Sequence, residues 1–166
     1  FTFGIAKADM LIRGGDPDNM QFGDTLDDDK FEGYQFDYCI SNPPFGIDWK
    51  REAIAVEAEH KKGAAGRFGP GLPSKSDGQM LFLLNGLSKL KPEGRMAIIQ
   101  NGSSLFTGGA GSGQAEIRRY LIENDWLDAI VQLPNDSFYN TGTATDLATI
   151  TKNKPPDHIG AVQLLD

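Results

Sequence analysis

The fold is decided by the stretch Tyr34-Gln35-Phe36-Asp37-Tyr38-Cys39-Ile40-Ser41-Asn42-Pro43-Pro44-Phe45-Gly46. Its first eight residues are rich in aromatic and β-branched side chains, and this composition favours a β-strand. The strand must end at Asn42, because neither Pro43 nor Pro44 has a backbone N–H to give to a neighbouring strand. Asn42 is therefore predicted to lie at the carboxyl end of a strand.

Helices and strands alternate downstream of this stretch. A helix is predicted to begin at Asp77, whose side chain can cap it, and to continue through Leu90 until Pro92 and Gly94 stop it. Its apolar residues cover most of its circumference, so the helix should be buried. The other expected elements are a strand over residues 95–100, a helix over 114–124, and strands over 127–133, 144–151 and 161–165. Residues 60–76 contain four glycines and two prolines, and they are expected to form a mobile loop.

The alternation of strands and helices predicts an α/β domain with a mostly parallel sheet. In an open sheet of this kind, ligands bind beyond the carboxyl ends of the strands. Asn42 is expected at such an end, so its position favours a functional site.

The composition is that of one globular domain. The chain has 166 residues, of which 39% are hydrophobic and 23% are charged. Its net charge of -7 argues against a small basic module that holds nucleic acid through the phosphates alone. The one net-basic stretch is residues 46–76, with six basic and four acidic groups, directly after the Asn-Pro-Pro-Phe sequence.

The sequence does not support a membrane protein, a secreted protein or a metal-binding protein. No apolar run approaches the roughly 20 residues of a membrane helix, and the first residues do not form an export signal. The single cysteine, Cys39, cannot make an internal disulfide, and His60 and His158 are too far apart for a Cys/His metal site. We expect a cytoplasmic protein without a structural metal.

The sequence Asn42-Pro43-Pro44-Phe45 supplies groups that can activate an aromatic amine. Such an amine is a poor nucleophile because its lone pair is delocalised into the ring. Two acceptors aimed at its N–H bonds would favour a pyramidal nitrogen, namely the side-chain oxygen of Asn42 and the backbone carbonyl of Pro43, which Pro44 stiffens. Phe45 offers a flat apolar face for a base that has left the duplex.

This sequence resembles the catalytic signature of amino-group methyltransferases, which use S-adenosyl-L-methionine. The resemblance to one family, the modification subunits of type I restriction-modification systems, covers nearly the whole chain. Besides residues 41–46, it is carried by Ala8-Asp9-Met10-Leu11-Ile12-Arg13-Gly14, Ser76-Asp77-Gly78-Gln79, Leu90-Lys91-Pro92-Glu93-Gly94-Arg95, Glu116-Ile117-Arg118-Arg119-Tyr120 and Ala129-Ile130-Val131-Gln132-Leu133-Pro134.

The resemblance implies a gamma-class, N6-adenine DNA methyltransferase with a Rossmann-like fold. Its partners would be a flipped adenine of DNA, a specificity subunit that reads the DNA sequence and a restriction subunit that cleaves. It implies that Asp24, 18 residues before Asn42 (42 minus 24), accepts the amino group of the cofactor's adenine. Asn42 would border both the cofactor and the base, and Phe138 would be a second aromatic residue against the flipped base.

In this family a glycine-rich cofactor loop normally precedes the segment that corresponds to residues 9–13, and a helical region follows the position of Asp166. The chain is therefore expected to be a partial catalytic domain over residues 1–166, incomplete at both ends and inactive by itself.

Two alternatives stay open from the residues. A glutamine-N5 protein methyltransferase presents an amide nitrogen to the same motif, usually with tyrosine at the position of Phe45. An inactive interaction fragment of a modification subunit would also keep these sequence blocks. A phosphate-binding loop over residues 108–113 is rejected, because Gln114 and Ala115 stand where that loop needs lysine and a hydroxyl residue.

Overall fold

The structure is a computed structural model that describes residues 1–138, 142 and 144–166. The described part contains five helices, five strands and two short 3-10 helices, none of which is long and apolar enough to cross a bilayer. In chain order they are α1 (Thr2–Ile12), η1 (Pro17–Asn19), β1 (Phe36–Ser41), α2 (Ala53–Lys61), η2 (Gly63–Ala65), α3 (Gln79–Ser88), β2 (Leu90–Asn101), α4 (Ser103–Phe106), α5 (Gly113–Glu123), β3 (Leu127–Gln132), β4 (Thr145–Thr151) and β5 (Gln163–Leu165).

The strands form one sheet in the order β1-β2-β4-β3-β5. Strand β4 is antiparallel to its neighbours β2 and β3, whereas the other four strands share one direction. The prediction of an α/β domain with a mostly parallel sheet is confirmed. The carboxyl ends of β1, β2 and β3 meet at one edge together with the start of β4, and we call this the carboxyl edge. The opposite edge is the amino edge.

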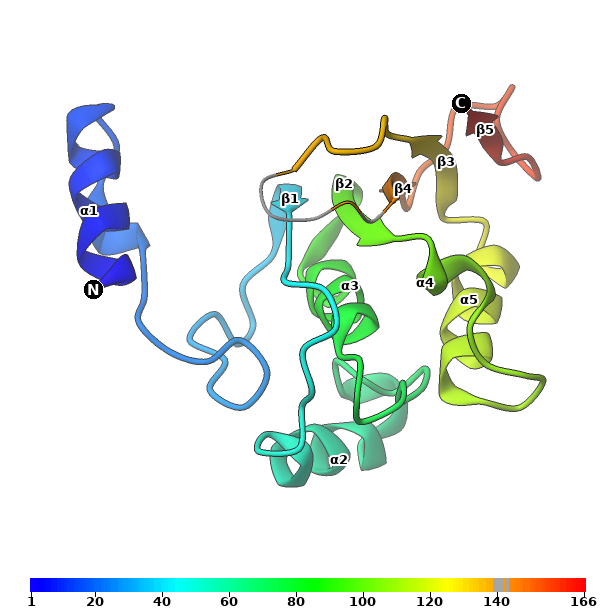
Figure 1. The fold of residues 1–166 in the computed structure, drawn as a ribbon, viewed down its shortest axis with the longest axis horizontal. Helices are drawn as coiled ribbons and strands as arrows, with labels where there is room; N and C mark the ends of the chain where they lie inside the picture. Colours follow the sequence, from blue (N-terminus) through cyan, green and yellow to red (C-terminus); the bar gives the residue numbers. More distant parts are fainter. Residues whose placement is uncertain (139–141, 143) are drawn as a thin grey trace.

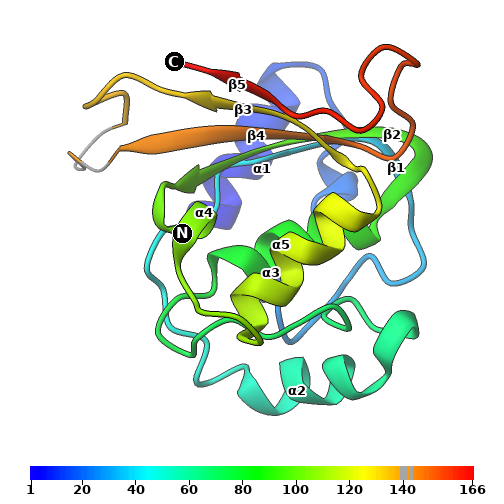
Figure 2. The same ribbon diagram turned by 90° about the vertical axis from the view of Figure 1, so that its right-hand side faces the viewer.

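The hydrophobic core lies on one face of the sheet. Helices α3 and α5 pack against this face, and α2 lies beneath them (Figures 1 and 2). The largest fully buried apolar side chains are Trp49, Phe68, Leu81, Leu83, Leu84, Leu90, Ile98, Ile117 and Ile150. Among the described residues no helix covers the other face, and Tyr38 and Ile40 of β1 are exposed. Helix α1 stands apart, beyond the β1 edge of the sheet (Figure 1), and buries none of its residues.

The prediction that the helix continues through Leu90 is wrong, because Leu90 opens β2 and pairs with Phe36 of β1. Pro92 falls inside this strand although it lacks a backbone N–H. It is accommodated because the register shifts, so that Tyr38, two residues after Phe36, already pairs with Arg95. Residues 91–94 thus bulge out of the ladder, where no hydrogen bond from Pro92 is needed.

The expected mobile loop over residues 60–76 is wrong for its central part. Phe68 is completely buried in the core, and its carbonyl lies 2.7 Å from Nδ1 of His60 at the end of α2. Arg67 is almost buried and pairs with Glu59 of α2. The start of the range is also helical, since α2 continues to Lys61 and η2 covers Gly63–Ala65. Irregular backbone follows from residue 66, and two large side chains fix it to the core.

Candidate active site

The Asn-Pro-Pro-Phe sequence lies at the carboxyl edge of the sheet, as predicted. Strand β1 ends at Ser41, so Asn42 is the first residue beyond it, and its side chain is exposed. Pro43 is buried and Phe45 is half-buried. An exposed amide therefore follows directly on a strand and precedes a buried proline.

The segment after Phe45 is joined to the segment before α3 by three hydrogen bonds. Gly78 donates its backbone N–H to the Ile47 carbonyl at 2.8 Å, and the Trp49 N–H donates to the Lys75 carbonyl at 3.1 Å. The indole Nε1 of Trp49 donates to the Ser74 carbonyl at 2.9 Å. The two segments therefore support each other at the carboxyl edge.

A buried amide network connects α3 to the end of β2. The side chain of Gln79 is almost fully buried, and its Nε2 donates to Oδ1 of Asn101 and to Oδ2 of Asp77, both at 2.8 Å. Its Oε1 accepts the backbone N–H of Asn101 at 3.1 Å. Asp77 was expected to cap the helix; Gly78 takes the N-cap position, while Oδ1 of Asp77 accepts the Gln79 N–H at 3.2 Å. A buried polar side chain that has hydrogen-bond partners for its donors and acceptors holds the segments around it in one arrangement.

Two further side chains lie at the carboxyl edge. Phe138 follows the end of β3, which is parallel to β1, and its side chain is half-buried. Asp146 lies near the start of β4, opposite Gln100 of β2, and is 8% exposed. Burial raises the pKa of the Asp146 carboxyl above its usual range. The structure thus brings Asn42 and Phe138 to one edge.

Replacing Asp146 by asparagine is expected to stabilise the protein at neutral pH. Because the folded-state pKa lies above the unfolded-state value near 4, the folded state binds more protons, and stability falls as the pH rises through this range. Asp146→Asn removes this cost, so Tm should rise at pH 7 and change much less at pH 3; each 1 kcal/mol gained would raise Tm by about 2–4 °C. Thermal unfolding at both pH values checks this. Asp27→Asn at an exposed site is the control, and equal gains for the two variants would contradict the prediction.

Asp24 lies in a different part of the molecule from Asn42. Its Oδ1 accepts the Leu26 N–H at 2.8 Å, so the carboxylate closes a turn. Arg67 holds this turn through hydrogen bonds to the Thr25 carbonyl at 2.7 Å and the Leu26 carbonyl at 3.1 Å.

The same guanidinium fixes where this turn lies. Nη1 of Arg67 donates to Oδ1 of Asn85 at 3.0 Å, in the last turn of α3. Helix α3 leads there into β2, which begins at the amino edge, so the turn of Asp24 lies near that edge. The roles of Asp24 and Asn42 in cofactor binding stay predictions.

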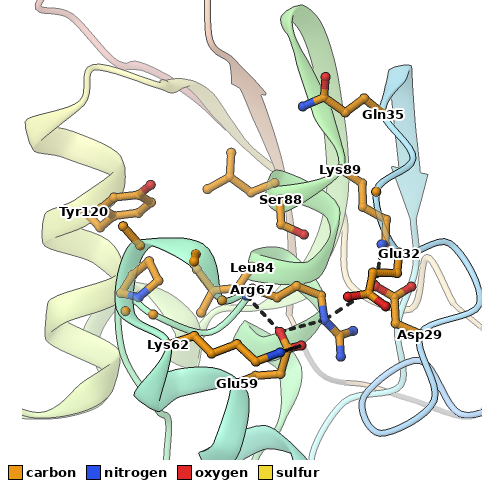
Figure 3. Close-up of a pocket in the computed structure, with 18 of the residues that line it drawn as sticks. Asp29, Glu32, Gln35, Glu59, Lys62, Arg67, Leu84, Ser88, Lys89 and Tyr120 are labelled. Carbon is orange, nitrogen blue, oxygen red and sulfur yellow. Dashed lines mark hydrogen bonds and ion pairs between the residues drawn. The ribbon is translucent and has the colours of Figure 1, made fainter.

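A cavity of about 630 Å³ also opens at the amino edge, and none of the predicted site residues lines it. Figure 3 shows Arg67 between Glu59 and Asp29, with Lys89 beside Asp29. Burial favours a higher pKa for the Asp29 carboxyl, but the hydrogen bond from Lys89 and the nearby positive charges outweigh it and lower the pKa. Lys62, Arg67 and Lys89 pair with carboxylates of the chain, and Lys152 donates to the Leu90 carbonyl. We therefore do not take this cavity as the candidate active site.

Sequence reasoning missed several residues of the carboxyl edge. Trp49, Gln79 and Asn101 entered no expected site, although Gln79 belonged to a recognised block. A glutamine among the apolar residues of a buried helix was the available signal, because a buried amide requires partners. Trp49 offered no comparable signal, since its partner Ser74 lies 25 residues away in the sequence.

Comparison with known proteins agrees with this geometry. The family described as N-6 DNA Methylase matches residues 1–166. The type I restriction enzyme MjaIX methylase subunit of Methanocaldococcus jannaschii is 29% identical over 165 residues, which are 99% of this chain and 29% of that protein. The MpnII methylase subunit of Mycoplasma pneumoniae is also 29% identical, over 92% of this chain and 29% of its own length.

A solved structure shows the same fold. The crystal structure of the type I restriction-modification methyltransferase subunit from Streptococcus thermophilus superposes with a TM-score of 0.79 and 31% sequence identity. The match covers 92% of this chain and 32% of that subunit. The chain thus spans about a third of the length of these relatives, and over its whole length it belongs to the N-6 DNA methylase family.

Proposed function

We propose that this chain carries the catalytic motif of a DNA methyltransferase that transfers a methyl group to the N6 amino group of adenine. The observation that carries the proposal is the exposed side chain of Asn42 at the carboxyl end of β1, followed by the buried Pro43. The proposed methyl donor is S-adenosyl-L-methionine, and the reaction takes place in the cytoplasm.

The chain's own contribution is to prepare the amine. The side-chain oxygen of Asn42 and the carbonyl of Pro43 accept the two N–H bonds of the adenine amino group. Both acceptors bind the N–H bonds more strongly in the transition state, because positive charge develops on the nitrogen as it becomes pyramidal and attacks the methyl group. Pro44 restricts the backbone of Pro43, so the second acceptor is already oriented before the base arrives. Transfer of the methyl group from sulfur to N6 leaves a cationic amine, which then loses one N–H proton to water, so no strong general base is needed.

Phe45 is proposed to stack on the flipped adenine, with Phe138 as a second aromatic contact. Phe45 is half-buried directly after the two prolines, so one part of its ring is fixed by the protein and another is accessible. Phe138 lies after β3 at the same edge. Two aromatic side chains at one edge suit a planar ring that has lost its neighbours in the duplex.

Phe45→Ala is expected to weaken productive binding of the base by about 1 to 3 kcal/mol, because a stacking surface is lost, whereas Phe45→Tyr should retain activity. Two oligonucleotides are used: methyl transfer is measured with adenine at the target position, and base flipping is measured with 2-aminopurine there, whose fluorescence rises when the base leaves the stack. If the alanine variant gave the same fluorescence rise and the same methylation as the wild type, the stacking role would be wrong.

We propose that the natural protein acts with other subunits. The relatives named above are methylase subunits of type I restriction enzymes, and the net charge of -7 does not favour a chain that holds DNA through the phosphates alone. A specificity subunit that reads the bases and a restriction subunit that cleaves would supply the missing functions.

The molecule that receives the methyl group, DNA or protein, distinguishes this function from the glutamine-N5 alternative. Labelled S-adenosyl-L-methionine is offered to the natural protein with DNA and, separately, with a glutamine-containing protein substrate. Digestion of the DNA to nucleosides followed by mass spectrometry should show N6-methyladenine. Label in methylglutamine, with none in DNA, would contradict the proposal.

A further inference from the structure

The segment that follows the Asn-Pro-Pro-Phe sequence depends on its flanks for its position. Asn42, Pro44 and Gly46 are exposed, and Gly46 has φ +67°, a conformation that only glycine adopts freely. On the amino side this segment is fixed by β1. On the carboxyl side the next buried side chain is Trp49, which is 1% exposed.

Trp49 holds this carboxyl flank through both its backbone and its ring. Its indole Nε1 donates to the Ser74 carbonyl at 2.9 Å, and the same carbonyl accepts the Asp77 N–H at 3.0 Å. The backbone N–H of Trp49 donates to Lys75, whose Nζ lies 5.7 Å from the centre of the indole ring. One carbonyl therefore joins the loop after Phe45 to the turn that leads into α3.

The turn itself is anchored to the end of β2. Asp77 and Gln79 share two hydrogen bonds, and Gln79 exchanges two more with Asn101. A continuous series of hydrogen bonds thus extends from the indole of Trp49 through Ser74, Asp77 and Gln79 to β2. It links the loop that follows Phe45 to the carboxyl end of β2.

We propose that Trp49 is a positioning residue for methyl transfer. Its hydrogen bond to Ser74 sets the position of the loop that carries Phe45 and keeps the acceptors of Asn42 and Pro43 aligned with the amine. The inference rests on the proposed function, since it concerns the same site. Alignment of reacting groups is sensitive to displacements of about 1 Å, so loss of this bond lowers the rate without removing any group that touches the base.

The first test replaces Trp49 by phenylalanine, which keeps an aromatic ring but removes the N–H donor. The control is Trp126→Phe. Trp126 lies at the amino edge, where its ring packs edge-on against Tyr120 at 5.3 Å. Both variants are made in the natural protein, with its partner subunits, and compared with the wild type. The rate constant at saturating DNA and cofactor, the KM for DNA and the affinity for S-adenosyl-L-methionine are measured separately.

The second test perturbs the same contact from the other side and leaves Trp49 in place. A Cβ added at Gly78 would lie 3.3 Å from both the Ile47 carbonyl oxygen and Cδ1 of Trp49. Gly78→Ala therefore presses on the loop, whereas Gly109→Ala places its Cβ where no atom lies within 4 Å and serves as the control. This pair gives an answer even if Trp49→Phe fails to fold.

We expect Trp49→Phe and Gly78→Ala to lower kcat about tenfold, with cofactor affinity and the content of folded protein changed less than twofold. The two controls should retain the wild-type rate. The inference is overturned if kcat stays within twofold of the wild type in both test variants, if a control loses as much, or if cofactor affinity falls in parallel. A wild-type protein that methylates no DNA would instead contradict the proposed function, so the two failures are distinguishable.

Discussion

Asn42→Ala is expected to lower the rate of adenine methylation by a factor of about 10² to 10³ in the natural protein. The substitution removes one of two acceptors that act mainly when the amine becomes pyramidal. A single preorganised group of this kind contributes roughly 3 to 4 kcal/mol to stabilisation of the transition state. Because the side chain of Asn42 is exposed and lies beyond β1, its loss should leave the fold intact. Single-turnover methyl transfer to DNA measures the effect.

The cofactor affinity and a control variant show whether the loss of rate is specific to the reacting amine. The affinity for S-adenosyl-L-methionine should stay within a few fold of the wild type, because the acceptor acts on the reacting amine. Asn19→Ala, in an exposed 3-10 helix, is the control and should leave the rate unchanged. Activity of Asn42→Ala within tenfold of the wild type would contradict a catalytic role for Asn42.

The 166-residue chain by itself is expected to have a weak affinity for S-adenosyl-L-methionine, with binding only near millimolar concentration. Micromolar affinity corresponds to about 8 kcal/mol and must be assembled from contacts with adenine, ribose and the methionine tail. In this structure Asp24 is bonded to Leu26 near the amino edge, while Asn42 lies at the carboxyl edge. We expect that residues placed in this way do not both contact one cofactor molecule, and affinity should therefore be weaker by a factor of about a thousand.

Titration calorimetry on this chain measures that affinity. Asp24→Ala in the natural protein is the companion variant, and it should weaken cofactor binding there if Asp24 contacts the adenine. One-to-one binding of S-adenosyl-L-methionine to the 166-residue chain at a few micromolar would contradict the prediction. It would show that the described residues already contain a complete cofactor site.

Much of the fold could be predicted from local sequence. The strand that ends at Asn42, the buried helix after Asp77 and the helix that corresponds to α5 all have strong local signals. Ser112, for example, caps α5 by accepting the Ala115 N–H, and Gly113 begins the helix. Such signals depend on neighbouring residues only, so they can be recognised without the structure.

The rest depends on contacts between distant residues. The start of β2 at Leu90 follows from pairing with Phe36, which is far away in the sequence and overrides the helical pattern before it. Helix α2 was not expected at all, although its alanine and glutamate residues favour a helix, because only Ala53 and Val56 are buried and its apolar pattern is weak. The burial of Phe68 likewise required knowledge of the helices around it.

In the candidate site, too, only the residues with local signals could be predicted from the sequence. Asn42 and Phe45 were identifiable, because their chemistry is local and proline marks the end of the strand. The network of Gln79 and Asn101 and the hydrogen bond from Trp49 to Ser74 join segments more than 20 residues apart, so spacing alone could not reveal them. The placement of the turn that contains Asp24 follows from the hydrogen bonds of Arg67 to the Thr25 and Leu26 carbonyls, which the sequence does not predict.

The central claim is that Asn42 and Pro43 hold the amino group that is methylated. The most direct measurement is a structure of the natural protein with its partner subunits, a DNA duplex that contains the target adenine, and an unreactive cofactor analogue. We expect the adenine N6 within about 2.6–3.2 Å of both Oδ1 of Asn42 and the Pro43 carbonyl oxygen, with the base against Phe45. A flipped adenine bound elsewhere, with its amino group out of reach of Asn42, would contradict the claim.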